Sequence, residues 1–147
     1  NPHRILVSGR TKHFTSAFGE HVIAFEVEEA MKATLEKYPA QITEFHLAPQ
    51  VNPDEGLPYH EWFIEFEKEP ENLNLFKNEL DDQLRKRNTY YDDLISGNIL
   101  QKLHLTALKK NAFHEYAKSQ GKLGGQNKTP RLANDRKIAD LLEIYKL

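Results

Sequence analysis

One stretch near the middle of the chain constrains the fold more than any other. From Tyr59 to Glu67 apolar side chains alternate with acidic ones along the chain. The apolar positions are Trp62, Ile64 and Phe66, and the acidic positions are Glu61, Glu65 and Glu67. This period of two predicts a β-strand whose apolar side belongs to the core. Phe63 lies on the acidic side, so we expect that side to be partly covered as well.

The flanking segments read as further strands and helices. Apolar residues recur at helical spacing from Phe25 to Tyr38, and Pro39 stops that helix. A second helix opens at Pro70, and a helical stretch follows between Asn88 and Gly97. Three more strands are predicted, at Arg4–Ser8, Ile42–Gln50 and Ile99–Lys109.

The order of these elements is β-α-β-β-α-β. It predicts an α+β fold of the ferredoxin-like split type, an antiparallel sheet with helices on one face. A short helix at Ala112–Ser119, a C-terminal loop and a last helix capped by Asn134 come after it. With 147 residues the chain has the length of a single domain.

The loop Ser119–Arg131 carries three glycines, Pro130 and three cations, Lys122, Lys128 and Arg131. Glycine lets the backbone bend sharply or approach a ligand, and proline keeps the preceding residue out of the helical region. Such a loop suits the binding of a phosphate or carboxylate. A solvated surface loop is the alternative reading. A second glycine-and-cation segment, Gly9-Arg10-Thr11-Lys12, lies near the start of the chain.

Several functional classes are disfavoured. The net charge of −2 provides no basic field for nucleic acid. There is no apolar run of membrane-spanning length and no signal peptide, so we expect no membrane partner and a cytoplasmic protein. The seven histidines lack metal-ligand spacing, so no metal site is predicted. The acidic pairs Asp81–Asp82 and Asp92–Asp93 are expected on solvated helix surfaces.

The N-terminal motif resembles the hinge of acyl-adenylate-forming enzymes. It consists of Gly9-Arg10-Thr11-Lys12, then Gly19 and Val22, then Glu26 and Glu28. In that superfamily the motif joins a large N-terminal domain to a small mobile C-terminal one. The resemblance implies that residues 1–147 are one such C-terminal domain, with the hinge at about 9–12, and that the adenylation domain is absent. A start at Asn-Pro without methionine agrees with this expectation.

Two further motifs are more specific. They are Pro58-x-His60-x-x-x-x-Glu65 and the run Phe113…Ser119-x-Gly121…Gln126-x-Lys128-x-Pro130-Arg131. Both resemble the C-terminal region of the Gretchen Hagen family, the auxin-responsive acyl acid-amido synthetases. The longer run from Gly124 to Arg136 is similar to the bacterial branch of that family. The resemblance covers nearly the whole chain.

The resemblance implies a two-step ligase that uses ATP and Mg²⁺, bound mainly by the N-terminal adenylation domain of the full-length protein. A carboxylic acid is adenylated, and an amine such as an amino acid then displaces AMP. Lys128 matches the lysine that enters the adenylation site, and Lys122 is the second choice. Arg10 and Arg131 are the expected cofactor contacts, and Lys12 is the expected hinge pivot.

Because the adenylation domain is missing, we expect the isolated chain to be inactive. The main alternative is a ferredoxin-like regulatory module that binds a small ligand. An RNA-binding domain is a third reading, disfavoured by the glutamates on the Trp62 strand and by the negative net charge.

Overall fold

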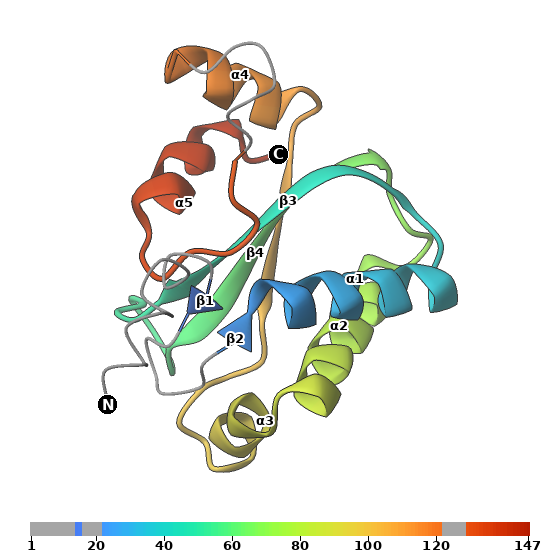
Figure 1. The fold of residues 1–147 in the computed structure, drawn as a ribbon, viewed down its shortest axis with the longest axis vertical. Coiled ribbons are helices and arrows are strands. Elements are labelled where there is room, and N and C mark those ends of the chain that lie inside the picture. Colours follow the sequence, from blue (N-terminus) through green and yellow to red (C-terminus); the bar gives the residue numbers. More distant parts are fainter. Residues whose placement is uncertain (1–13, 16–21, 122–128) are drawn as a thin grey trace, which may run out of the picture.

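A three-stranded sheet lies at the centre of the fold (Figure 1). The computed structural model describes residues 14–15, 22–121 and 129–147. Strand β4 (Tyr59–Lys68) lies between β3 (Gln41–Gln50) and β5 (His104–Leu108). It is antiparallel to β3 and parallel to β5. The alternating stretch Tyr59–Glu67 is therefore part of the central strand.

The chain enters this sheet through a small hairpin and a helix. β1 (Phe14–Thr15) pairs with β2 (Val22–Ile23), and α1 (Ala24–Lys37) follows directly. The carboxylate of Glu26 accepts a hydrogen bond from the Ile23 amide at the start of α1. Such bonds satisfy one of the amide groups that a helix leaves unpaired at its N-terminus. The predicted helix 25–38 is thus confirmed to within one residue at each end.

Two further helices form the crossover between β4 and β5. They are α2 (Leu73–Arg87) and α3 (Thr89–Ser96), and each begins with an asparagine whose side chain accepts a backbone hydrogen bond. Asn72 caps α2, and Asn88 caps α3. Asn88 also donates to Glu26 (3.0 Å), which ties the start of α3 to the start of α1.

The largest apolar cluster lies between the sheet and helices α1, α2 and α3. It takes Trp62, Ile64 and Phe66 from β4, together with Phe45 and Leu47 from β3. The helices contribute mainly the residues of their inward stripes: Val27, Ala30, Met31, Phe76, Leu80, Leu84 and Tyr91. The apolar side predicted for the central strand is therefore confirmed as core.

A second, smaller cluster covers the other side of the sheet. Phe63 and Ala48 pack there against α4 (Ala112–Ser119) and α5 (Lys137–Leu142), which a short 3₁₀ helix, η2 (Glu143–Tyr145), continues. Figure 1 shows α4 and α5 on the side of the sheet opposite α1 and α2. The expectation that the acidic side of β4 is partly covered is confirmed, because Glu61 and Glu65 are buried there.

The α+β class is confirmed, but the described sheet does not have the ferredoxin-like order. In the ferredoxin-like order the first strand of the chain lies between the last two strands, which a helix connects. Here helices α2 and α3 connect β4 to β5, and these two strands pair directly with each other. The helices also lie on both faces and not on one. The physical reason is Phe63: a large apolar side chain on the second face has to be covered, and the C-terminal helices cover it.

Four local predictions are wrong. The strand predicted at Ile99–Lys109 begins only at His104, and the helix predicted to open at Pro70 begins at Leu73. The last helix begins at Lys137 and not after Asn134, and Asp135 accepts a hydrogen bond from the Lys137 amide (3.0 Å). Asp81 is buried and not solvated. Its Oδ1 accepts hydrogen bonds from the Tyr91 hydroxyl and from the Leu103 amide (3.2 Å), which ties α2 to α3 and to the approach to β5. Burial raises the pKa of the Asp81 carboxyl.

The C-terminus returns to the sheet. The Lys109 amide donates to the Tyr145 carbonyl (2.8 Å), and the Leu147 amide donates to the Ala107 carbonyl (3.1 Å). The last residues therefore lie along the outer edge of β5. No helix in the described part of the chain combines the length and the apolar composition that crossing a membrane requires.

Glu65 holds the start of α4 from the sheet below it. Its two carboxylate oxygens accept hydrogen bonds from the amides of Asn111 (2.7 Å) and Phe113 (3.0 Å). Asn111 occupies the N-cap position with a φ of 70° and makes no side-chain cap of its own. The carboxylate of Glu65 therefore replaces a local cap.

We predict that Glu65→Ala lowers the free energy of unfolding by about 1–3 kcal/mol, because two helix-terminal amides lose a charged acceptor. Urea denaturation of the wild type and the variant measures this loss. Glu67→Ala is the matched control, since that side chain is 59% exposed, and we expect it to change stability by about 0.5 kcal/mol at most. Equal effects of the two substitutions would contradict the capping role.

Candidate functional site

Only one of the predicted site residues can be placed. Arg10, Lys12, Lys122 and Lys128 lie outside the described residues. Arg131 lies within them, at the end of the glycine-rich loop. The candidate site is therefore built from Arg131 and the groups that surround it.

The segment that follows the loop is fixed along the outer edge of β3. The Leu47 amide donates to the Arg131 carbonyl (2.8 Å), and the Ala133 amide donates to the Leu47 carbonyl (3.0 Å). Leu132 forms a parallel bridge with Leu47 between these two bonds and is itself buried. The backbone that leaves the loop is thus held as a short additional strand.

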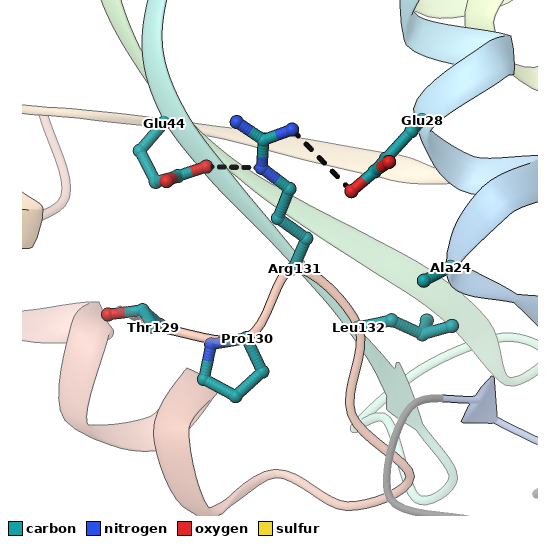
Figure 2. Close-up of a pocket in the computed structure, with 7 residues that line it drawn as sticks. All are labelled: Ala24, Glu28, Glu44, Thr129, Pro130, Arg131 and Leu132. Carbon is teal, nitrogen blue, oxygen red and sulfur yellow. Dashed lines mark hydrogen bonds and ion pairs between the residues drawn. The ribbon is translucent and has the colours of Figure 1, made fainter. Parts of the chain in front are cut away.

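The Arg131 side chain connects three elements (Figure 2). Its Nε lies 2.7 Å from the Glu44 carboxylate on β3, and its Nη1 lies 3.6 Å from the Glu28 carboxylate on α1. The guanidinium also lies 4.7 Å from the centre of the Phe45 ring, within the range of a cation–π contact. Arg131 therefore joins the end of the loop to the sheet and to the first helix.

His46 holds the preceding residue. Its Nδ1 lies 2.6 Å from the carbonyl oxygen of Pro130. A carbonyl only accepts hydrogen bonds, so Nδ1 carries the hydrogen and donates it. The other ring nitrogen, Nε2, is buried and has no hydrogen-bond partner among the described residues. The ring is therefore neutral. The pKa of His46 is lowered to about 4, mainly because the ring is buried.

A cleft of about 410 Å³ opens beside these groups. The residues that line it come from the start of α1, from β3 and from the end of the loop: Ala24, Glu28, Glu44, Thr129, Pro130, Arg131 and Leu132 (Figure 2). Two carboxylates face one guanidinium, so the charged side chains of the cleft sum to −1. A phosphate could reach Arg131 here only in competition with Glu28 and Glu44.

Three residues of this site were not predicted from the sequence: Glu28 as a cleft residue, Glu44 and His46. In the sequence Glu28 is part of the hinge motif, and His46 is one of seven histidines without metal-ligand spacing. The partner of His46 lies 84 residues away along the chain. No local pattern of spacing signals such a pair, because it arises only when the loop end packs against β3.

A second charged cluster lies on the α5 side of the sheet. Arg136, whose side chain is 12% exposed, pairs with Glu61 (3.0 Å), Asp140 (3.1 Å) and Glu143 (3.1 Å). Glu61 also accepts a hydrogen bond from the Thr106 hydroxyl. Each of the three carboxylates bonds to Arg136, so the cluster connects β4, β5 and α5. It holds three carboxylates against one guanidinium and therefore offers no cation to a phosphate.

The fold and the segment 129–133 define the class, a small α+β domain in which the residues that follow a glycine- and lysine-rich sequence are held at the edge of a sheet. The family model described as "GH3 family C-terminal domain" matches residues 25–137. The chain therefore belongs to the GH3 family, the Gretchen Hagen family of the resemblance above, and corresponds to its C-terminal domain.

Solved structures agree with this assignment. The structure of "GH3.15 acyl acid amido synthetase" superimposes with a TM-score of 0.73 at 16% sequence identity. That of "AtGH3.15 acyl acid amido synthetase in complex with 2,4-DB" gives 0.71 at 15% identity. Each match covers 92% of this chain and 26% of the other, so the chain spans about a quarter of these proteins. Among curated proteins none matches the chain.

The lowered pKa of His46 predicts a pH dependence of stability. The unfolded chain takes up a proton near pH 6.5, whereas the folded chain does so only near pH 4. The unfolded state binds more protons in this window, so stability is full above pH 6.5 and falls as the pH drops toward 4. The loss attributable to His46 is on the order of 2–3 kcal/mol.

Urea denaturation between pH 7 and pH 4 tests this prediction by comparing the wild type with His46→Asn. The variant should lose less stability over the window, since asparagine does not titrate. Charges near His46, namely Arg136, Asp135 and Glu44, remain in both proteins and cancel in the difference. His114→Asn, at an exposed position on α4, is the control. If the free energy of unfolding falls equally with pH in the wild type and in His46→Asn, the titration of His46 is not the cause of the pH dependence.

Proposed function

We propose that this chain is the mobile C-terminal domain of an ATP-dependent acyl acid amido synthetase. The observation that carries the proposal is the match of residues 25–137 to the GH3 C-terminal domain. The fold shared with two solved structures of GH3.15 acyl acid amido synthetase agrees with it. The partner of this domain is then an N-terminal adenylation domain of the same full-length protein.

The proposed reaction has two half-reactions. The carboxylate of an acid attacks the α-phosphorus of ATP, which gives an acyl-adenylate and releases pyrophosphate. The nitrogen of an amine, such as an amino acid, then attacks the acyl carbon, loses a proton and displaces AMP, which gives an amide. The C-terminal domain rotates about the hinge at residues 9–12 between the two steps, and Lys12 absorbs the change in backbone angles.

We assign the mobile cation of the adenylation step to Lys128, with Lys122 as the alternative. Negative charge shifts between the phosphate and carboxylate oxygens as the acid attacks. An ammonium already positioned beside them stabilises that charge without reorganising solvent. The sequence motif Gln126-x-Lys128-x-Pro130-Arg131 supports Lys128, and the anchoring of Pro130 and Arg131 on β3 gives the loop a fixed end.

Arg10 and Arg131 are the proposed contacts to ATP within this domain. Arg131 bonds to Glu44 and ion-pairs with Glu28 in the structure, so a phosphate has to displace at least one carboxylate. The cleft around Arg131 has an excess of one negative charge and does not fit a nucleotide triphosphate by itself. We therefore place ATP and Mg²⁺ mainly in the adenylation domain, with this domain adding cations.

The alternative function is a regulatory module that binds a small ligand. The cleft beside Arg131 is the observation that favours it, because carboxylates and a guanidinium together suit a zwitterion such as an amino acid. Membership in the bacterial branch and a cytoplasmic location stay predictions from the sequence.

We predict that Lys128→Ala lowers acid-dependent pyrophosphate release by about a hundredfold, as expected for the loss of a preorganised charge. The measurement uses the full-length protein with ATP, Mg²⁺ and a panel of carboxylic acids. Lys122→Ala is the matched control from the same loop, and the isolated 147-residue chain should release no pyrophosphate. A loss in Lys122→Ala alone would move the role to Lys122. No release with any acid would favour the regulatory module.

The competition at Arg131 gives a second test. Glu44→Gln removes the closest carboxylate from the guanidinium, so a phosphate that binds Arg131 should bind more tightly. We expect the KM for ATP to fall several-fold in full-length Glu44→Gln and to rise in Arg131→Ala. If both variants keep the KM of the wild type, Arg131 does not contact ATP and serves only to hold the loop.

A further inference from the structure

Four consecutive residues of β3 hold the backbone that leaves the glycine-rich loop. Glu44 and Phe45 contact the Arg131 side chain, His46 bonds to the Pro130 carbonyl, and Leu47 bonds to the backbone of Arg131 and Ala133. Because each of these four consecutive strand residues contacts the segment, we infer that this part of β3 anchors it.

The contacts differ in strength. Arg131 is 41% exposed at its side chain, and ion pairs of that kind contribute little to stability. The backbone bonds of Leu47 begin one residue after Pro130. Proline has no amide hydrogen, so its carbonyl is the only backbone hydrogen-bonding group by which Pro130 can be held. The bond from His46 to that carbonyl is short, and the side chain of His46 is fully buried.

We propose that His46 is a positioning residue for the adenylation step: by holding the Pro130 carbonyl it sets where the loop ends and how far Lys128 reaches. This inference rests on the proposed function of Lys128. The covalent geometry of two peptide units keeps the Cα of Lys128 within about 7 Å of the Cα of Pro130. A fixed Pro130 therefore restricts the region that the lysine can occupy.

The expected kinetic effect follows from the sensitivity of catalysis to placement. A displacement of about 1 Å can lower the rate about a hundredfold. Removing the donor from His46 should therefore lower kcat for pyrophosphate release by about 10- to 100-fold, with the KM values for ATP and acid nearly unchanged. If a variant only lowered the amount of folded protein, all activities of the enzyme would fall together. A positioning role instead predicts a loss in the adenylation step, which uses Lys128.

Two substitutions separate the hydrogen bond from the volume of the ring. In asparagine the amide nitrogen is attached to Cγ, as Nδ1 is in histidine, so His46→Asn keeps a donor toward Pro130. His46→Leu keeps an apolar side chain of similar bulk and has no donor. Met31→Ala, at a buried position of α1 that takes no part in the contacts of Pro130 and Arg131 described above, is the control for general destabilisation. All variants are made in the full-length protein and assayed well below their unfolding temperatures.

The first readout is hydrogen exchange of the backbone around Ala133, whose amide bonds to Leu47. We expect exchange to rise about tenfold in His46→Leu and to stay near the wild-type rate in His46→Asn and Met31→Ala. Unchanged exchange in His46→Leu would overturn the proposal whatever the activity of the protein, because the anchor would then not depend on His46.

The second readout is a double-mutant cycle for pyrophosphate release. If His46 acts through Lys128, His46→Leu lowers kcat in the wild type and adds almost nothing in Lys128→Ala, whereas His46→Asn restores most of the activity. Equal losses in both backgrounds would show a general structural role and overturn the proposal. If Lys128→Ala itself has no effect, the proposed role of Lys128 fails first, and the positioning role of His46 fails with it. The exchange result still reports separately whether His46 anchors the segment.

Discussion

The structure depends on the burial of β4 on both faces. Trp62 and Ile64 face the larger cluster with α1 and α2, and Phe63 faces the smaller cluster with α4 and α5. A central strand with apolar side chains in both directions needs two covering layers, because an exposed phenylalanine leaves a large apolar area in water. The second layer is what brings the C-terminal helices, and with them Arg131, back to the sheet.

Carboxylates then fix the orientation of this second layer. Glu65 bonds to the start of α4, and Glu61 bonds to Arg136 at the start of α5. A buried carboxylate has to be paired or hydrogen-bonded. Each glutamate is therefore compatible only with helix orientations that place a hydrogen-bond donor against its carboxylate. Apolar packing brings the helices to the sheet, and these polar contacts determine how they lie on it. The apolar packing and the polar contacts together determine where the end of the loop lies.

Much of the fold could be predicted from the sequence, and the site largely could not. Periodicity located α1, α4 and the central strand, because it reports which side chains lie in an apolar environment. It does not report which element supplies that environment, so the parallel pairing of β5 with β4 and the burial of Asp81 were missed. The bond between His46 and Pro130 joins residues 84 apart and leaves no local signal. Arg131 was a candidate from the composition of the glycine-rich loop, and the family motif supported it.

The outer strands of the sheet share one further property. The edge of β3 is covered near Leu47 by residues 131–133, and the edge of β5 is covered near Leu108 by residues 145–147. Open strand edges pair readily with other chains. Both covering segments follow every strand of the sheet in the chain, so a ribosome completes the three strands before it has made either cover. During synthesis the nascent sheet therefore passes through an interval in which both of its edges are open to aggregation, and that interval ends only when the last residues are available.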